Sequence, residues 1–512
     1  MNDWNAGYLT DITYTYGYYA ELNPLRMQLA FLNAGLAFPE CGTACELGFG
    51  QGISANIHAA ASVSHWSGTD FNPSHAAFAQ ELAGISKAST RLFDEAFSEF
   101  CARDDLPEFD FICLHGIWSW IPDDDRKVIV DFIRRKLKVG GVLYISYNTQ
   151  PGWAAMVPMR HLLAEHAGVM AAPGQDLVKR VDEAINFVDS LLAVNPAYSR
   201  ANPLVVERMK GIKSQNRTYI AHEYFNRVWQ PQPIAEINRW LVEANLSYAC
   251  SANYLDHLDV INLTGEQQTF LKAIPDSVFR ETVRDFMVNQ QFRRDYWVRG
   301  ARPINVVEQT ELLRKQRIVL VRPRAEVTLK ATGLVGEASF AKEVYDPILD
   351  ILADHAPKSL SQIEQAVAGK GINFSQVLQV AVVLAGKGDV VSALATEPSP
   401  VVVAQCERLN QHVMDKARSG GELSYLASPL TGGAMPVGRF HQLFLLSKAK
   451  GGKKPDDWAS FAWQTLSGQG LKLVKDGHQL ATDTENLAEL SAQAKEFAEK
   501  WLPIMTALGI SR

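Results

Sequence analysis

The sequence predicts an α/β fold built around a mainly parallel β-sheet. Between residues 43 and 148, five apolar strand-like segments alternate with helix-like segments, the pattern of a parallel sheet with helices on both faces. The first of these strands, residues 43–47, runs directly into three alternating glycines and then a helix-like segment. A glycine-rich turn between a strand and a helix is typical of a site for a nucleotide-type cofactor.

Length and composition limit the class of protein. With 512 residues, the chain exceeds the roughly 250–300 residues that one core usually supports, so we expect several domains. The net charge of -6 argues against a general polyanion binder, and we expect no nucleic-acid partner. Residues 1–4 do not resemble a secretory signal, and the apolar runs are shorter than the about 20 residues that span a membrane. We therefore expect a cytoplasmic protein.

The six cysteines are scattered and contain no Cys-x-x-Cys pair, which predicts reduced, buried thiols. We expect no metal site. The cysteines are Cys41, Cys45, Cys101, Cys113, Cys250 and Cys406.

An unusual tyrosine-rich segment precedes the first strand. Residues 8–20 hold five tyrosines in thirteen positions without a helical or strand period. Two interpretations stay open, a lid over a site or a strap that packs on the surface. Asn23 and Pro24 then predict the start of a helix, because proline suits the first helical turn. The leucines at 25, 29, 32 and 36 lie on one face of that helix.

The second strand ends at an acid. After a helix over residues 53–61, the segment 65–69 leads to Asp70, which lies 18 residues past Gly52. In nucleotide-binding α/β units, an acid at about this distance accepts hydrogen bonds from ribose hydroxyls. The alternative is that Asp70 caps the next helix near Pro73, although Asn72 alone would suffice for that cap.

Polar groups also end the remaining strands. The third strand, 91–97, carries Asp94 and Glu95, and the fourth spans 109–115. A helix begins after Pro122 and stops at glycines 140 and 141, and the fifth strand spans 142–148. Because the carboxyl ends of parallel strands meet at one edge, we expect one shared site there. Its members are Glu46, the glycine loop, Asp70, Glu95, His115 with Gly116, and Tyr147 with Asn148.

The rest of the chain predicts accessory parts. Residues 151–215 are helical and form an insertion, either a substrate cover or a dimer contact. A second helical block begins at Tyr219, and residues 246–255 and 293–298 are strand-like and would complete the sheet. Residues 293–324 hold nine Lys or Arg against three acids, which predicts a solvated face or, alternatively, a surface for an acidic partner.

Residues 340–394 have the outline of a winged helix. Three helices at 344–353, 360–368 and 374–384 precede a short strand at 389–392. The third helix carries no basic residue before Gly386, and a DNA reader needs cations there to meet phosphates. We therefore predict a packing or protein-contact module. The remaining residues to 512 are mainly helical, and the glycine-containing loop 428–436 is interpreted as a turn.

The glycine loop itself indicates which cofactor to expect. It reads Glu46-x-Gly-x-Gly-x-Gly, and no Gly-Lys-Ser/Thr is present, which excludes a P-loop ATPase. A carboxylate at the head of the loop would repel a pyrophosphate. It suits the amino-acid end of S-adenosylmethionine, which carries a cation. A second sequence feature that is common in enzymes using this cofactor is the segment Lys138-Val-Gly-Gly before an apolar strand.

These motifs resemble those of class I S-adenosylmethionine-dependent methyltransferases. The resemblance lies in residues 46–52, Asp70 and residues 137–143. Further segments are similar to bacterial methyltransferases with a methyltransferase regulatory domain, a group that includes the rickettsial protein lysine methyltransferases. They are His115–Pro122, Ser146–Trp153, Tyr219–Asn226 and Leu426–Gly433, together with the winged-helix-like segment. The resemblance thus covers nearly the whole chain.

The resemblance implies a Rossmann-like class I methyltransferase sheet with a helical insertion, a winged-helix-like module and a helical C-terminal region. The implied parts are a cofactor-binding core at 1–150, a helical insertion at 151–215, a regulatory region that completes the sheet at 216–330, the winged-helix-like module at 331–398 and a C-terminal helical domain at 399–512.

The resemblance also implies the activity and the residues that carry it. The activity is N-methylation of lysine side chains in a protein substrate, by a homodimer with an open cleft. The alternatives are a small-molecule or glycan O- or N-methyltransferase and a non-enzymatic scaffold. By position, the methionine part of the cofactor would lie at Glu46, Gly48, Gly50 and Gly52, and the ribose at Asp70. The adenine would lie at Glu95 and Ala96, with Asp94 as the alternative to this pair. The acceptor would lie at His115, Trp118 and Tyr147, and His115 would also contact the cofactor.

The chemistry assigns further roles to aromatic residues. A lysine acceptor must be neutral, and its free pKa is about 10.4, which burial beside aromatic rings would lower. Trp118, Trp120, Trp153 and the tyrosines of residues 14–19 are candidates for such a lining, with core packing as the alternative. His115 would act either as a base or as a hydrogen-bond donor.

Overall fold

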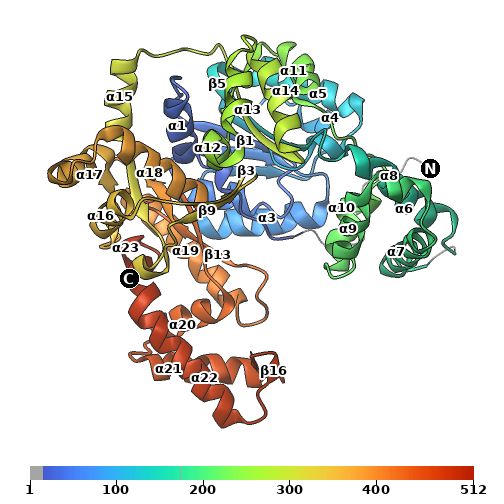
Figure 1. Cartoon of the computed structure of the whole chain (residues 1–512). Helices are drawn as coiled ribbons and strands as arrows, with labels where there is room; N and C mark the ends of the chain where they lie inside the picture. Colours follow the sequence, from blue (N-terminus) through green and yellow to red (C-terminus); the bar gives the residue numbers. More distant parts are fainter. Residues whose placement is uncertain (1–14, 173–174, 512) are drawn as a thin grey trace.

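The centre of the molecule is a seven-stranded β-sheet with the strand order β3-β2-β1-β4-β5-β7-β6 (Figure 1). The computed structural model describes residues 15–172 and 175–511. The first five strands are parallel, whereas β7 runs antiparallel to β5 and to β6. The predicted sheet is therefore confirmed, and the two later segments complete it. The strands are β1 Thr43–Leu47, β2 His65–Thr69, β3 Thr90–Phe93, β4 Phe109–Leu114, β5 Leu137–Asn148, β6 Leu246–Ser251 and β7 Phe292–Arg299.

Three strands differ from their predicted bounds by more than two residues. β6 ends at Ser251 rather than at 255, because a 3₁₀ turn begins at Tyr254. β3 ends at Phe93, because Phe97 already begins the short helix α4 (Phe97–Phe100). β5 begins at Leu137, five residues before the predicted start at 142. Leu137 leaves the preceding helix in an extended conformation and pairs with Phe109, so that residues 137–141 join the sheet through an irregularity. The helix consequently ends before the two glycines.

Helices cover both faces of the sheet. One face packs against α1, α2 and α3, and the other against α4, α5 and α11. Apolar side chains at alternate strand positions supply the two cores, because successive strand residues point to opposite faces. Asn23 and Asn72 cap α1 and α3 as their sequence positions predict. The helices are α1 Pro24–Asn33, α2 Ile53–Ala60, α3 Pro73–Ser86, α5 Asp123–Lys136, α11 Ile234–Val242 and α14 Ser277–Val288.

The predicted insertion is helical and has a core of its own, which includes Trp153. It lies to one side of the sheet, on the right in Figure 1. Its helices are α6 Val157–Val169, α7 Leu177–Ala193, α8 Ala197–Ala201, α9 Pro203–Ile212 and α10 Arg217–Phe225.

The segment predicted to resemble a winged helix contains three helices and a three-stranded antiparallel sheet of order β11-β8-β12. One strand, β8, precedes residue 331 and so comes from the region before the expected module. Shorter elements precede the helices. The elements are α12 Asp259–Asn262, α13 Gly265–Lys272, α15 Val306–Lys315, β8 Arg317–Leu320, β9 Lys330–Gly333, β10 Gly336–Ser339, α16 Lys342–Leu352, β11 Lys358–Ser359, α17 Leu360–Val367, α18 Phe374–Lys387 and β12 Val390–Ala393.

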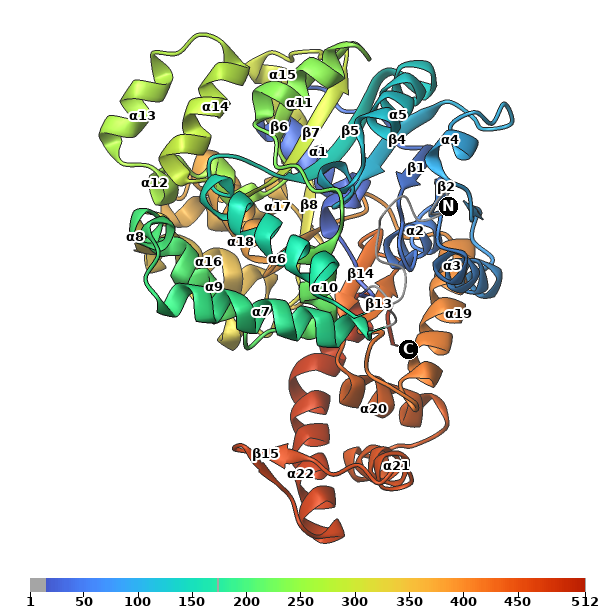
Figure 2. The ribbon, with the colours of Figure 1, turned by 90° about the vertical axis from the view of Figure 1, so that its right-hand side faces the viewer.

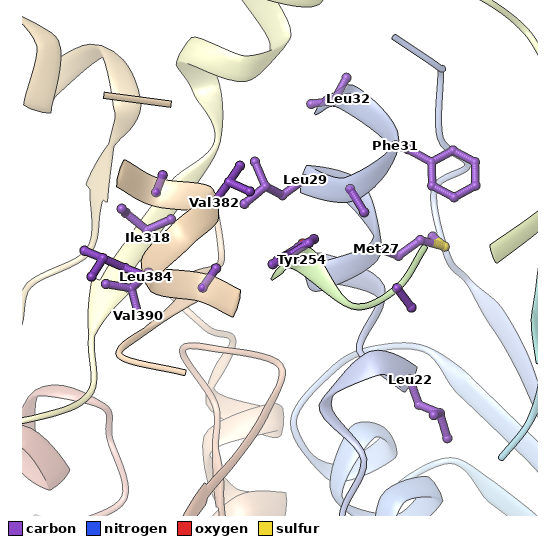
Figure 3. Close-up of a cluster of buried hydrophobic side chains, with 14 of the residues drawn as sticks. Leu22, Met27, Leu29, Phe31, Leu32, Tyr254, Ile318, Val382, Leu384 and Val390 are labelled. Carbon is purple, nitrogen blue, oxygen red and sulfur yellow. The ribbon is translucent and has the colours of Figure 1, made fainter. Parts of the chain in front are cut away.

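The third helix of this segment, α18, is buried in the main core. Its Val382 points toward Leu29 of α1, and Leu384 lies beside Ile318 and Val390 (Figure 3). The helix also packs against the 3₁₀ turn Tyr254–His257. Its apolar face therefore serves to join this segment to the sheet domain, in keeping with a packing role.

The C-terminal region is mainly helical, as predicted, and α20 to α22 extend below the rest of the molecule (Figure 2). Of the predicted turn at 428–436, residues 429–432 connect the two strands of a β-hairpin, β13-β14, and residues 433–436 form the second strand. This hairpin packs against α2, and its turn is tied there by hydrogen bonds from Asn23 Nδ2 to Thr431 O (2.9 Å) and from His58 Nδ1 to Gly432 O (3.1 Å). The elements are α19 Pro400–Lys416, β13 Tyr425–Ser428, β14 Gly433–Pro436, α20 Arg439–Ala449, α21 Pro455–Ser467, β15 Val474–Lys475, β16 His478–Gln479, α22 Asp483–Glu496 and α23 Leu502–Ala507.

The basic stretch at 293–324 is largely used for ion pairs within the chain. Arg293 and Arg294 bind acids in the core and near the N-terminus, and three further arginines bind acids of α16–α18 and the residues beside them. These pairs involve five of the nine basic residues. They are Arg293–Asp295, Arg293–Asp285, Arg293–Glu281, Arg294–Glu21, Arg314–Glu364, Arg322–Asp389, Arg324–Asp346 and Arg324–Asp350.

Three further expectations bear on composition. All six cysteines are free, and five are buried. In the described part of the chain, no helix has the length and apolar character needed to cross a bilayer. The same residues hold no group of three or more His, Cys, Asp or Glu side chains placed to bind a metal ion.

Candidate cofactor and active site

A cavity of about 190 Å³ lies at the carboxyl ends of β1, β2, β3 and β4. Four of the five predicted strand ends meet here, together with part of the N-terminal segment. Tyr147 and Asn148, at the end of the fifth strand, are not among the lining residues. The lining residues that the sequence predicted are Glu46, Gly48, Gly50, Asp70, Glu95, Ala96, His115 and Gly116. The expectation of one shared site thus agrees with the arrangement of these residues.

The glycine loop forms one wall of this cavity. Gly48, Gly50 and Gly52 all have positive φ angles of 73°, 57° and 68°, a region that glycine adopts without strain. A Cβ at Gly48 would come within 2.5 Å of the Ile117 side chain, and one at Gly52 within 2.5 Å of Ala79. Gly52 does not line the cavity but shapes the turn that leads into α2. The loop therefore requires glycine for conformation and for space.

Glu46 is a buried carboxyl group at the head of the loop. Only 2% of the residue is exposed, and its Oε2 atom has no hydrogen-bond partner among the described residues. Burial raises the pKa of Glu46 to about 8, and the nearby charge of Asp70 acts in the same direction. A buried carboxyl group without a donor is costly. The site therefore suits a ligand that presents a cation or a hydrogen-bond donor to Glu46.

Asp70 braces the glycine loop as well as facing the cavity. Its Oδ2 accepts a hydrogen bond from the Gly50 amide (2.8 Å), and its Oδ1 accepts one from the Asn72 amide (3.0 Å). The helix cap proposed as an alternative is supplied by Asn72, whose side chain accepts from the Ser74 amide. A carboxylate has about four acceptor positions, which leaves Asp70 able to accept from ligand hydroxyls.

The end of β3 presents Glu95 and Ala96 to the cavity, and the rival residue Asp94 is not among the lining residues. The Arg103 guanidinium binds Glu95 Oε1 at 2.6 Å. Thr69 Oγ1 also donates to the Glu95 carbonyl. Glu95 is thus fixed by the strand next to it and by the following loop.

His115 is enclosed by aromatic rings. The Tyr19 ring stacks on it at 3.4 Å between centroids, and its Nδ1 lies 2.9 Å from the Tyr144 hydroxyl. Burial lowers the pKa of His115 to about 4, with Arg294 acting in the same direction and Glu21 opposing. The imidazole is therefore neutral near pH 7. Its Nε2 has no recorded hydrogen-bond partner among the described residues, and the residue lines the cavity.

The structure does not bring Trp118 and Tyr147 to this cavity. Trp118 is fully buried, and its indole N–H donates to Gln232 Oε1 at 2.7 Å. The Tyr147 hydroxyl donates to Asp295 Oδ2 at 2.7 Å inside the opposite core. Tyr144 and Tyr147 lie three positions apart on one strand, so they point to opposite faces. Tyr144 is therefore the tyrosine of β5 that contacts His115.

The described part of the tyrosine-rich segment both lines the cavity and packs on the surface. Thr15, Gly17 and Tyr19 face the cavity, while Tyr16 packs on Phe78 and Tyr18 on His58. Residues 8–14 lie outside the described residues. Within the described residues, positions 15, 17 and 19 thus agree with the lid interpretation, and positions 16 and 18 agree with the strap interpretation.

Of the two other tryptophans predicted as an aromatic lining, Trp120 lines the cavity, whereas Trp153 belongs to the core of the insertion.

The other lining residues were not singled out as site residues in the sequence, although most are neighbours of motif positions. The additional lining residues are Phe49, Gln51, Phe71, Asn72, His75, Phe97, Ile117, Ile121, Pro122 and Asp125.

The strand order and the position of the cavity resemble those of class I methyltransferases. A family model described as "Predicted methyltransferase regulatory domain" matches residues 216–299. The chain is 38% identical over 513 residues to uncharacterized protein sll1526 of Synechocystis sp., covering 99% of this chain and 100% of that protein. It therefore belongs to the same family as sll1526.

More distant proteins share parts of the sequence or the fold. Uncharacterized protein RP789 of Rickettsia prowazekii is 28% identical over 192 residues, or 37% of this chain and 34% of that protein. The structure of PKMT2 from Rickettsia typhi in complex with AdoHcy is 18% identical, with a TM-score of 0.70, over 97% of this chain and 99% of that chain. The predicted methyltransferase fold is thereby confirmed.

Proposed function

We propose that this protein transfers the methyl group of S-adenosylmethionine. The buried carboxyl group of Glu46 at the head of the glycine loop carries the proposal, because its Oε2 has no hydrogen-bond partner among the described residues. The ammonium group of the cofactor's amino-acid end would supply the donor that this oxygen lacks. AdoHcy, the demethylated cofactor, is bound in the R. typhi protein of the same fold.

The remaining lining residues fit the other parts of this cofactor. We assign the methionine part to Glu46, Gly48 and Gly50, with Gly52 shaping the loop, and the ribose hydroxyls to Asp70. The adenine is assigned to the cavity wall at Glu95 and Ala96. Asp70, and Glu46 once it is ionised, would repel a pyrophosphate, which argues against a dinucleotide.

When bound, S-adenosylmethionine supplies a methyl group that is already activated for displacement. The work left to the chain is alignment of the acceptor with the methyl group and handling of one proton. His115 lines the cavity, is neutral near pH 7 and has no hydrogen-bond partner at Nε2 among the described residues, which suits it to accept that proton. The acceptor lone pair forms the bond to the methyl carbon, and the bond from that carbon to sulfur breaks.

We propose lysine side chains of a protein as the acceptor. The sequence motifs resemble those of rickettsial protein lysine methyltransferases, and Tyr19 and Trp120 give the cavity aromatic walls that would favour a neutral amine. A small molecule or glycan is the alternative acceptor. We propose that the chain is divided into five parts, which end at residues 150, 215, 330, 398 and 512. The parts outside the cofactor-binding core would bind the substrate or form a homodimer contact.

Two measurements test the proposal. Calorimetry should detect binding of S-adenosylhomocysteine to the wild-type protein and weaker binding to Glu46→Gln. Incubation with methyl-labelled S-adenosylmethionine and a cell lysate should then label a protein band. Label confined to small molecules would favour the alternative acceptor. Absence of cofactor binding by the folded wild-type protein would overturn the function itself.

A further inference from the structure

A short 3₁₀ turn, Ala20–Leu22, follows directly after the tyrosine that stacks on His115. Glu21 in this turn is 8% exposed. Its carboxylate binds the Arg294 guanidinium, and its carbonyl accepts a hydrogen bond from the Tyr296 hydroxyl at 2.6 Å. Both partners belong to β7, which lies within the segment matched by the regulatory-domain model. Residues 216–299, here called the regulatory segment, therefore bind the N-terminal segment beside the cavity through an ion pair and a hydrogen bond.

Alternation along β7 gives this strand two separate tasks. Arg294 and Tyr296 point to the face of the sheet that carries the N-terminal segment. Arg293 and Asp295 point to the other face, where they bind each other and Asp285. The contact with Glu21 is thus distinct from the buried ionic network behind the sheet, and the two can be altered separately.

The charges around His115 are unbalanced without Glu21. The groups that face the imidazole are the rings of Tyr19, Tyr144 and Phe292 and the charges of Glu21 and Arg294. Arg26 of α1 adds a second cation beside Glu21. If His115 took a proton, three cations would surround a single carboxylate. A buried cation is costly unless an anion is close. The negative charge of Glu21 therefore lowers the free-energy cost of protonating His115.

We propose, on the basis of the function proposed above, that Glu21 is a positioning residue for methyl transfer. It seats Tyr19 against His115 and provides the negative charge that His115 needs when it accepts the acceptor's proton. Arg294 of the regulatory segment fixes Glu21 in that place. The regulatory segment thereby contacts the reacting groups through the ion pair with Glu21, the hydrogen bond from Tyr296 and the ring of Phe292 beside His115, without lining the cavity itself.

Opposite charge changes at the two partners test this role. Glu21→Gln removes the anion, so the pKa of His115 falls further and kcat drops by about 100-fold, the usual contribution of a positioned base. Arg294→Met removes a cation, so the pKa of His115 rises and the acid limb of the kcat profile moves to higher pH. Glu21→Asp, which keeps the charge, should restore part of the activity. KM for S-adenosylmethionine should change little in each case.

Two controls separate this inference from the function on which it rests. Arg314→Met breaks an ion pair of similar type with Glu364, remote from the cavity, and should leave the pH profile unchanged. NMR titration of the His115 ring, assigned with His115→Asn in histidine-labelled protein, reads the pKa without any turnover. Failure of the wild type to bind cofactor overturns the proposed function. Unchanged His115 titration in folded Glu21→Gln and Arg294→Met overturns the role of Glu21.

Discussion

The two ends of the cavity are built in different ways. The cofactor end consists of loops that follow neighbouring strands, and its key contact joins Asp70 to Gly50, 20 residues apart. The acceptor end is assembled from distant segments: Tyr19 stacks on His115, and Arg294 binds Glu21 across 273 residues. The cofactor end is therefore a local property of one strand–loop–helix unit. The acceptor end exists only after the whole chain has folded.

Substitution in the glycine loop gives the largest expected effect at the cofactor end. Gly52→Val places a branched side chain at a positive φ and within the space of Ala79. Strain and overlap together cost at least about 3 kcal/mol, so we expect the Kd for S-adenosylhomocysteine to rise more than about 100-fold. Calorimetry measures this Kd. Gly84→Ala, where the added atom meets nothing within 4 Å, is the matched control and should bind normally.

Asp70 and Asn72 separate a binding role from a capping role. Asp70→Ala removes an acceptor for the Gly50 amide and for the ligand, and affinity for S-adenosylhomocysteine should fall about 10- to 100-fold. Asn72→Ala removes the cap of α3, which lowers the free energy of unfolding by about 1 kcal/mol. Because Asn72 also lines the cavity, affinity should fall, but by less than in Asp70→Ala. Calorimetry and denaturant unfolding of both variants provide the comparison. Equal loss of affinity in the two variants would contradict the assignment of Asp70 to the ligand.

The raised pKa of Glu46 predicts a pH dependence at the cofactor end. Without ligand, the folded state holds a proton on Glu46 up to about pH 8, whereas the unfolded chain loses it near its ordinary value of 4.5. The contribution of this group to stability is therefore present at low pH and is lost as pH rises through about 8. Cofactor binding, which needs the carboxylate, should strengthen over the same interval and release a proton.

The control for this pH dependence is Glu46→Gln, which should bind more weakly and without proton release. Calorimetry in buffers of different ionisation enthalpy reads the released proton directly. A wild-type protein whose binding is independent of pH between 6 and 8 would show that Glu46 does not contact the ligand's cation.

Trp118 and Tyr147 provide the smallest expected effects on activity. Trp118→Phe and Tyr147→Phe each remove one buried hydrogen bond, so stability should fall by about 1 to 3 kcal/mol while kcat stays close to that of wild type. Thermal unfolding and single-turnover methyl transfer test this expectation. Loss of transfer with unchanged stability would instead support the acceptor role that the family resemblance implies for these residues, and would extend the acceptor end beyond the described cavity.

The contrast between the two ends also explains what the sequence could predict. Glu46, Asp70 and Glu95 follow strands whose apolar pattern is plain, so their meeting at one edge was predictable. The face on which Tyr144 or Tyr147 lies depends on the register of β5, and the early start at Leu137 was hidden by two glycines. Likewise, composition alone made residues 293–324 look like a basic surface. Their partners, such as Glu21 and Asp389, are remote in sequence and are found only in the fold.

The hairpin of β13 and β14 bears on how the protein matures. Its turn accepts hydrogen bonds from Asn23 and His58, and Tyr18 of the segment that lines the cavity packs against Tyr425. Residues 18–23 therefore reach their final position only after the chain has been made as far as residue 433. During synthesis the cofactor loop can form early, because domains generally fold as units in order. The N-terminal segment that lines the cavity reaches its place only after the β13-β14 hairpin has been made. A chain that lacks this hairpin therefore has an open cofactor cavity.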